Sequence, residues 1–201
     1  MTATPEGDRV VCEDLTDEIV ARYTAQGYTL VFAEDVMRHD LSDLSDLPAS
    51  ALPTGVTLVA WTPEVVPAFF AAYAAAFADR PGFPGWSQEQ WVAWTSGDPD
   101  FRPNLSWVAL ADTEPVGFIT CAEDSREPTP VGFIIQTGTR PDWRGRGLAT
   151  ALVVRALRDC RDAGYSAAML DVNVNNPTAR RLYDRLGFRV IRRRGAFQRG
   201  G

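Results

Sequence analysis

Lysine is absent from the sequence, whose 20 basic residues are all arginine. A phosphate-binding loop of the Walker type needs its lysine, and a Schiff-base enzyme needs a lysine amine, so both classes are excluded. Histidine is nearly absent as well, since His39 is the only one and its neighbours suggest no catalytic partner. We therefore expect a site that works without lysine and without histidine.

Cysteines and long apolar runs are also scarce. Cys12, Cys121 and Cys160 lie far apart and form no Cys-x-x-Cys pair, which predicts buried, reduced thiols and indicates neither a bound metal nor a disulfide framework. No apolar run approaches the roughly 20 residues needed to cross a bilayer. The N-terminus is acidic and lacks the features of a signal peptide. We expect a cytoplasmic protein without a membrane partner.

The composition is that of a globular protein with an uneven charge distribution. The chain has 201 residues, of which 45% are hydrophobic and 23% charged, enough for one domain with a full core or one domain plus a fragment. Residues 1–46 carry 11 acids and 3 arginines, whereas residues 180–199 carry eight arginines and one acid. Such a tail can bind nucleic acid, but its arginines alternate with apolar residues, which favours a solvated face. No nucleic-acid partner is expected.

Apolar periodicity and turn formers predict an α/β (α+β) fold. It has a mixed sheet with antiparallel strands first, a β-α-β half later, and helices on both faces. The predicted strands are 10–12, 28–36, 56–61, 106–111, 116–122, 131–135, 167–172 and 188–193. The predicted helices are 16–26, one starting at Thr62 and running through Phe77, 88–95, one following the segment 139–149, and 179–186. The segments 40–53 and 123–130 are predicted to be loops.

The most informative segment runs from Thr139 to Ala149 and is rich in glycine and arginine. A predicted strand leads into it and an amphipathic helix follows. A helix N-terminus offers unpaired N–H groups and the positive end of the helix dipole, and glycines let the backbone approach an anion closely. The segment therefore suits a phosphate or pyrophosphate, although a helix N-terminus accepts anions whatever its purpose.

The two ends of the chain resemble each other when one is displaced by 160 residues. The segment 23–28 then falls on 183–188, and Val10 falls on Leu170. We interpret residues 1–46 as a partial, degenerate repeat or an N-terminal extension, 47–55 as a linker and 56–201 as the main domain. The repeat lacks a glycine- and arginine-rich loop, so it should not bind a cofactor alone.

Two motifs of the main domain together resemble a known family. Arg-x-x-Gly-x-Gly/Ala is matched by Arg144-Gly-Arg-Gly147-Leu-Ala149. Asn-x-x-Ala-x-x-Leu-Tyr-x-x-x-Gly-Phe is matched from Asn176 to Phe188. In this order they resemble the GNAT superfamily of acyl-CoA-dependent N-acetyltransferases over 56–194. The N-terminal repeat is similar to the degenerate half of tandem members, such as mycothiol synthases.

The resemblance implies acetyl-CoA as cofactor and transfer of its acetyl group to a primary amine by direct attack in a ternary complex. The pyrophosphate of coenzyme A would lie on the loop and helix N-terminus, and the pantetheine arm along the preceding strand. The implied cofactor-binding residues are Ile135, Gln136, Thr137, Thr139, Arg144, Gly145, Arg146, Gly147, Leu148, Ala149, Asn176 and Tyr183.

Tyr183 is the implied general acid, because a phenol can protonate a departing thiolate. Packing on the apolar face of its helix is the alternative. Glu123 is the candidate general base, with Asp124 and a water chain as alternatives, and either acid could instead be a solvated loop residue. Phe83 and Trp86 lie in a Pro/Gly-rich loop and are candidates for contacts with the acceptor, with core packing as the alternative. The acceptor is a small-molecule or peptide amine, and a homodimer is compatible with the resemblance.

Two rival functions are weighed against acetyl transfer. Gly145-x-Gly147 followed by Asp171 loosely imitates a dinucleotide fingerprint, but Thr150 stands where the third glycine belongs. A non-catalytic acyl-CoA sensor or regulatory module is the second alternative. The intact Tyr183 argues for catalysis but does not decide the matter.

Overall fold

The computed structural model describes residues 3–6, 8–49, 51–80, 83–126 and 129–199. The chain forms two compact units. The terminal unit contains residues 1–39 and 169–201, and the central unit contains residues 40–168. The boundary falls within strand β8 (Ala167–Asn173).

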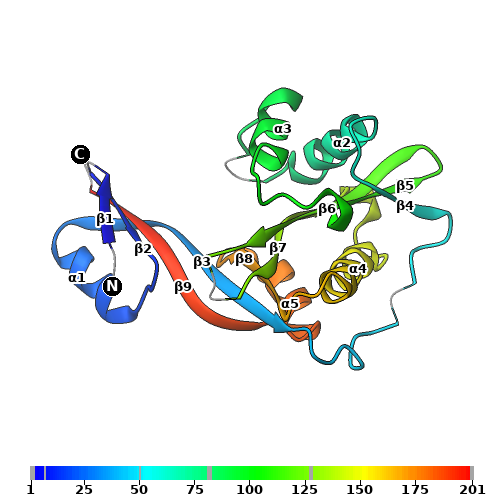
Figure 1. Ribbon diagram of the computed structural model, residues 1–201. Coiled ribbons are helices and arrows are strands. Elements are labelled where there is room, and N and C mark those ends of the chain that lie inside the picture. Colours follow the sequence, from blue (N-terminus) through cyan, green and yellow to red (C-terminus); the bar gives the residue numbers. More distant parts are fainter. Residues whose placement is uncertain (1–2, 7, 50, 81–82, 127–128, 200–201) are drawn as a thin grey trace. The chain divides into compact units, whose positions relative to one another are not determined.

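The central unit is built on an antiparallel ladder of four strands. They are β4 (Val56–Ala60), β5 (Trp107–Ala111), β6 (Glu114–Asp124) and β7 (Val131–Thr139), in the order β7-β6-β5-β4. Helices α2 (Val66–Phe77) and α3 (Gln88–Ser96) cover one face, and α4 (Leu148–Asp162) covers the other (Figure 1). Two 3-10 turns, η1 (Pro103–Leu105) and η2 (Pro141–Trp143), complete the unit.

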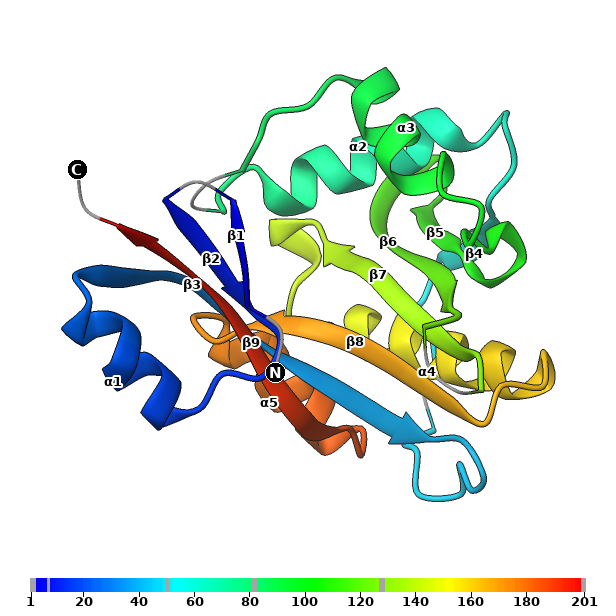
Figure 2. The same ribbon diagram turned by 60° about the vertical axis from the view of Figure 1, so that its left-hand side comes forward.

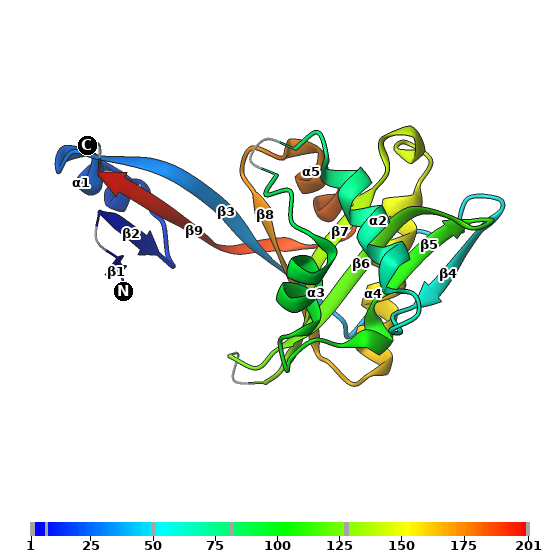
Figure 3. The ribbon, with the colours of Figure 1, turned by 90° about the horizontal axis from the view of Figure 1, so that it is seen from above.

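Aromatic side chains and close backbone approach hold these layers together. Tyr73 of α2 stacks on the fully buried Trp91 of α3 with ring centroids 5.0 Å apart. Burial of each large apolar side chain contributes about 1.5–3 kcal/mol. Helix α2 crosses β6 (Figure 3), and a Cβ on Gly138 of the neighbouring β7 would lie 2.8 Å from the Ala76 side chain. On the other face, a Cβ on Gly132 would lie 2.4 Å from the Cys160 sulfur, so both helices require glycine beneath them.

A β-bulge interrupts the ladder between β6 and β7. Thr120 pairs with Gln136 and the next residue, Cys121, pairs with Ile134, so Ile135 has no partner opposite it in this ladder. A bulge redirects side chains and leaves one residue outside the regular pairing. Consequently Gln136 lies on the face of α3, where its Oε1 accepts a hydrogen bond from the Trp91 indole N–H at 3.0 Å.

The terminal unit combines both ends of the chain. Its strands follow the order β1-β2-β9-β3-β8, with β1 (Ala3–Glu6), β2 (Arg9–Cys12), β3 (Tyr28–Asp40) and β9 (Arg189–Arg199). The long strands β3 and β9 run antiparallel side by side (Figure 2). Its helices are α1 (Asp17–Ala25) and α5 (Pro177–Arg185). The two helices begin 160 residues apart, and Gly27 and Gly187 follow them with φ of 82° and 91°.

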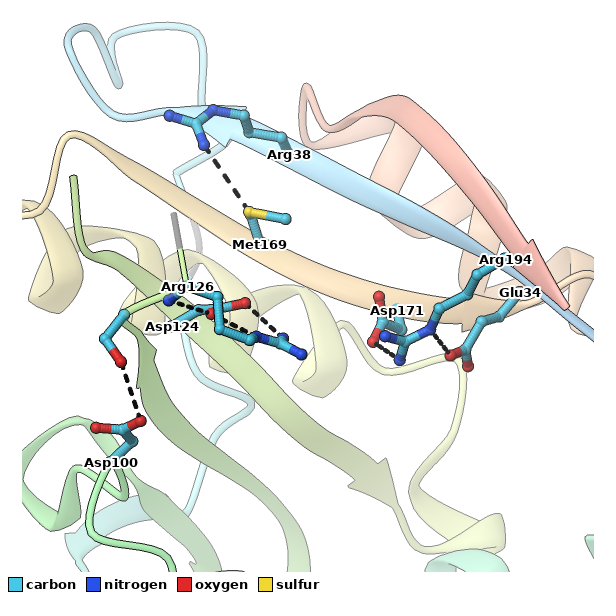
Figure 4. A network of polar contacts seen from close by, with 9 residues as sticks. Glu34, Arg38, Asp100, Asp124, Arg126, Met169, Asp171 and Arg194 are labelled. Atoms are coloured by element: carbon cyan, nitrogen blue, oxygen red, sulfur yellow. Dashed lines mark hydrogen bonds and ion pairs between the residues drawn. The ribbon is translucent and has the colours of Figure 1, made fainter. Parts of the chain in front are cut away.

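Several arginines near the C-terminus form ion pairs with acidic side chains of the terminal unit. The buried Asp35 of β3 accepts hydrogen bonds from Arg180 and Arg193. Arg194 bridges Glu34 and Asp171 (Figure 4). These arginines hold the strands of the terminal unit together.

The fold class is as predicted, but several element boundaries are not. Helix α2 begins at Val66 rather than at Thr62, because the chain first makes a turn in which the Val65 N–H donates to the Thr62 carbonyl. Strand β6 extends through Asp124, so the predicted loop at 123–130 begins too early. Strands β7 and β9 continue to Thr139 and Arg199, and β1 was not predicted. Pairing with neighbouring strands explains each extension.

The three cysteines are buried and free, as expected. No helix in the described ranges combines the length and the apolar character needed to cross a membrane.

Candidate cofactor-binding site and active-site residues

The loop between β7 and α4 turns at two glycines in the left-handed region. Gly145 has φ of 78° and Gly147 has φ of 83°. Residues that carry a Cβ adopt this backbone conformation only at a cost in free energy. A Cβ built on either glycine would meet nothing within 4 Å. The glycines are therefore needed for backbone conformation, and the space beside the loop is open.

Helix α4 begins at this open loop. Gly147 is the N-cap residue and supplies no side-chain hydrogen bond. The first hydrogen bond of the helix is donated by the Ala151 N–H to the Gly147 carbonyl, at 3.0 Å. The preceding N–H groups, those of Leu148, Ala149 and Thr150, therefore have no acceptor within the helix. These groups and the positive end of the helix dipole suit an anion.

The arginines around the loop divide into two roles. Arg140 donates to Asp142 and Glu114, and Arg144 donates to the Ala76 carbonyl at 2.9 Å and to Asp79. These two guanidinium groups fix the loop to the rest of the central unit. Arg146 is exposed and stacks on Trp143 at 4.6 Å, and it has no ion pair with any described residue. Its charge is therefore the one most available to an incoming anion.

Strand β7 leads into the loop and presents several polar groups. The Thr137 hydroxyl donates to the Phe118 carbonyl at 3.2 Å, and Gln136 is held by Trp91. The Thr139 hydroxyl is buried and has no hydrogen-bond partner within the described ranges. Because a buried hydroxyl without a partner is costly, this oxygen is a candidate contact for a bound ligand.

Glu123, the candidate base, is the penultimate residue of strand β6. Its Oε2 accepts a hydrogen bond from the Tyr165 hydroxyl at 2.6 Å and pairs with Arg102 at 3.0 Å. The Tyr165 hydrogen bond, followed by that of Arg102, lowers the pKa of Glu123. The carboxylate is therefore ionised at neutral pH, and two groups already compete for it.

Asn176 and Tyr183 lie in the terminal unit, on α5. Asn176 is the N-cap residue, and its Oδ1 accepts from the Ala179 N–H at 3.1 Å, which explains an asparagine at this position. Tyr183 is 7% exposed and packs edge-on against Phe188 at 5.7 Å. Burial raises the pKa of Tyr183 to about 12, so its hydroxyl keeps its proton.

The aromatic residues of the α2–α3 connection are only partly buried. Phe83 packs on Tyr73 with centroids 5.5 Å apart, as part of the aromatic core. Trp86 packs on Trp94 at 5.4 Å, and Trp94 is 49% exposed. The Trp86–Trp94 pair is thus the more accessible of these surfaces.

The central unit therefore contains 135–149, Glu123, Phe83 and Trp86, of which Glu123 and Ile135 line one hollow, while the terminal unit holds Asn176 and Tyr183. The sequence did not indicate the partners of Glu123 and Arg144 or the Gln136–Trp91 contact. These contacts join residues 21 to 68 positions apart, for which the sequence offered no signal.

An α/β fold with a mixed sheet and a glycine-rich loop opening into a helix defines a class of proteins that bind phosphate-containing ligands. The particular family is shown by comparison. Residues 64–188 match the model of the acetyltransferase (GNAT) family. The chain belongs to this family.

Relatives and solved structures agree with this assignment. A mycothiol acetyltransferase of Streptomyces scabiei is 36% identical over 171 residues, covering 84% of this chain and 54% of that protein. One of Parafrankia sp. is 34% identical over 163 residues, covering 73% and 50%. A GCN5-related N-acetyltransferase from Sphaerobacter thermophilus has a TM-score of 0.76 and 28% identity, covering 98% of this chain and 62% of that one. The chain spans about half the length of the curated relatives it matches.

Proposed function

We propose that the protein is an N-acetyltransferase that moves an acetyl group from acetyl-CoA to a primary amine by direct attack in a ternary complex. The observation that carries the proposal is the open loop of Gly145 and Gly147 at the N-terminus of α4. Family membership supplies the identity of the anion. The acceptor is a small-molecule or peptide amine, and a cytoplasmic location and a homodimer stay predictions.

The residues present fit coenzyme A. The N–H groups of 148–150 and the exposed Arg146 would hold the pyrophosphate. The open space beside both glycines leaves room for it, and the unpartnered Thr139 hydroxyl offers a further contact. Residues 135–139 of β7 would bind the pantetheine arm, and the Asn176 side-chain amide would contact the cofactor. When bound, acetyl-CoA supplies a thioester whose carbonyl carbon an amine can attack.

Two side chains are proposed to take part in the proton transfers of the reaction, one as donor and one as acceptor. Tyr183 Oη holds its proton through neutral pH, because burial raises its pKa to about 12, and this proton is available to a thiolate. Glu123 Oε2 is the proposed acceptor of the amine proton. The hydrogen bonds from Tyr165 and Arg102 lower the pKa of Glu123. Glu123 would therefore accept a proton as the hydrogen bond from the Tyr165 hydroxyl rearranges. Asp124 and water stay alternatives for this step.

Phe83 and Trp86 are the proposed acceptor contacts. Both are half-buried and pack against the aromatic core, but Trp86 also packs on Trp94, which is 49% exposed, and is therefore the better placed of the two. Trp86→Ala should therefore raise the KM for the acceptor more than Phe83→Ala does. An unchanged acceptor KM in Trp86→Ala would count against this role.

We further propose the domain division 1–46, 47–55 and 56–201, in which 1–46 is a partial repeat of the family fold. It is supported by the 160-residue offset between β2, α1, β3 and β8, α5, β9. Since 1–46 holds no glycine- and arginine-rich loop, this segment is not expected to bind the cofactor alone.

The test separates binding from chemistry. Isothermal titration with coenzyme A should give saturable binding, and release of free thiol from acetyl-CoA should depend on an added amine. Tyr183→Phe should lower turnover with binding nearly intact. Tight binding without turnover on any amine, together with no effect of Tyr183→Phe, would replace the enzyme with an acyl-CoA sensor.

A further inference from the structure

A hollow of about 360 Å³ opens in the central unit beside the β-bulge. Trp94 and Thr95 of α3, Asp98 and Asp100 of the following loop, and Phe133 and Ile135 of β7 are among the residues that line it. Ile135 is the bulged residue and immediately precedes Gln136. The hollow therefore adjoins the part of β7 that the proposed function assigns to the pantetheine arm of the cofactor.

The charge in this hollow is negative. Four carboxylates line it, against the single guanidinium of Arg126. Two of the four have arginine partners: Glu123 pairs with Arg102, and Asp124 binds Arg126 in a two-bonded arrangement (Figure 4). The remaining negative charge lies on Asp98 and Asp100.

Asp98 and Asp100 are held in place without a counter-charge. The Asp98 Oδ1 accepts from the Asp100 N–H at 2.8 Å, and the Asp100 Oδ2 accepts from the Ser125 hydroxyl at 3.4 Å. Neither carboxylate has an ion pair with a described residue. Asp100 is also anchored through its backbone, since its carbonyl accepts from the Glu123 N–H at 2.8 Å. A cation entering the hollow would meet two positioned, uncompensated carboxylates.

A second, independent feature points to a ligand in the same hollow. Thr95 is 1% exposed, and its hydroxyl oxygen is buried with no hydrogen-bond partner within the part of the chain that the structure describes. Such an oxygen gains a partner when a ligand N–H enters. Trp94 and Phe133 add apolar walls that suit the methylene groups of an alkyl chain, and an indole face also favours a cation.

We propose that the acceptor is a small diamine or polyamine, an inference that rests on the proposed acetyltransferase function. One nitrogen, neutral when it reacts, takes the acetyl group near the bulge of β7. A second nitrogen stays protonated and is held by Asp98 and Asp100. In the transfer, a C–N bond replaces the C–S bond of the thioester, the nitrogen gives up one proton and the sulfur takes one.

The experiment compares 1,6-diaminohexane with n-hexylamine, which differ only in the second amine. Thiol release from acetyl-CoA is measured with the full chain. The wild type should show a kcat/KM about ten- to a hundredfold higher for the diamine, through KM. In the double variant Asp98→Asn/Asp100→Asn this preference should disappear, while hexylamine turnover stays unchanged. Asn retains the oxygen that caps the Asp100 N–H, so the loop should fold.

Asp112→Asn is the matched control. It removes one carboxylate charge, against two in the double variant, from the β5–β6 hairpin at the other end of β6, and asparagine tolerates the φ of 54° found there. Equal kcat/KM for the two amines in the wild type, or an equal loss for both in the double variant, would overturn the inference.

Failure of the proposed function gives a different result. If coenzyme A binds but no amine is acetylated, titration of 1,6-diaminohexane into the coenzyme A-loaded protein still decides the inference. Saturable binding that the double variant loses and Asp112→Asn keeps would support a diamine site. Absence of such binding would refute it.

Discussion

Replacing Gly147 separates the two things that this glycine does: it adopts a left-handed conformation and it leaves an anion site open. Its φ is 83°, and a Cβ there would meet nothing within 4 Å. Gly147→Ala therefore costs only backbone strain, about 1–2 kcal/mol. For a chain of this size that lowers Tm by about 2–8 °C. The affinity for coenzyme A should stay within a few-fold of the wild type.

Gly147→Glu adds a negative charge to the same strain. In the free protein, a carboxylate at the N-terminus of α4 gains about 0.3–1 kcal/mol from the helix dipole, so Gly147→Glu should be no less stable than Gly147→Ala. Against a bound pyrophosphate, a carboxylate about 6 Å from one phosphate charge is repelled by roughly 0.7–2.8 kcal/mol, and by about twice that for two charges. Binding should weaken by about tenfold to more than a thousandfold.

Gly164→Glu is the matched control, because Gly164 has φ of 91°, has equally open surroundings and follows the other end of α4. The two positions are about 25 Å apart along the helix, so coenzyme A binding should be unaffected. Isothermal titration gives Kd for each variant, and thermal unfolding without ligand gives Tm. Two results would refute the reasoning: a Gly147→Glu variant that binds within threefold of the wild type, or a Gly147→Ala variant that binds as weakly as Gly147→Glu.

Three further changes test other parts of the structure. Tyr183→Phe should remove an alkaline destabilisation. Burial raises the pKa of Tyr183 from 10.0 to about 12, so its contribution to stability is intact below pH 10 and falls by about 3 kcal/mol as the pH rises through 12. Urea unfolding at several pH values can follow this loss. Gln136→Ala leaves the buried Trp91 N–H without its acceptor and should lower the free energy of unfolding by about 1–3 kcal/mol, with Gln136→Glu as the control that keeps an acceptor. Asp35→Ala should lower the free energy of unfolding, measured with urea, by about 1–3 kcal/mol. This loss is smaller than that of breaking a fully buried ion pair, because Arg180 and Arg193 are 35% and 49% exposed and stay hydrated. An unchanged urea midpoint would contradict this prediction.

Features encoded within a few neighbouring residues were predictable from the sequence. Helix α3 begins with a capping box between Ser87 and Gln90, and α1 begins at the Thr16 cap, as their sequences indicate. The strand-loop-helix arrangement around Gly147 was predictable for the same reason, because glycine and apolar spacing are local signals. The fold class followed from these elements taken in order.

Features that depend on distant partners were not predictable. The bulge at Ile135 arises from the pairing of two strands, and the sequence of either strand alone carries no mark of it. The partners of Arg144 were not predictable either: its guanidinium donates to the Ala76 carbonyl of α2 and to Asp79 just beyond that helix, 68 and 65 positions earlier, and its role as a ligand contact stays a prediction. The sequence indicates that an arginine is present but not which acid or carbonyl will hold it.

The register of β3 and β9 supports the proposed repeat more strongly than the sequence similarity does. Glu34 pairs with Arg194, its own counterpart 160 residues on. Every other pairing of this ladder except Tyr28 with Arg199 has its mirror image: Leu30 with Phe197, for example, corresponds to Met37 with Val190. Even the irregularities match, because the ladder skips Val31 on β3 and Ile191 on β9, and both side chains are exposed.

The order of strands obeys the same symmetry. In β2-β9-β3-β8, exchange of elements 160 residues apart returns the same order reversed. Two unrelated segments would have no reason to share helix length, bulge position and register, so common origin within one chain is the economical explanation. The N-terminal copy keeps the residues that pack: Val10, Cys12 and Tyr23 enclose the fully buried Phe197 of β9. On this account, the N-terminal copy serves to bury β9.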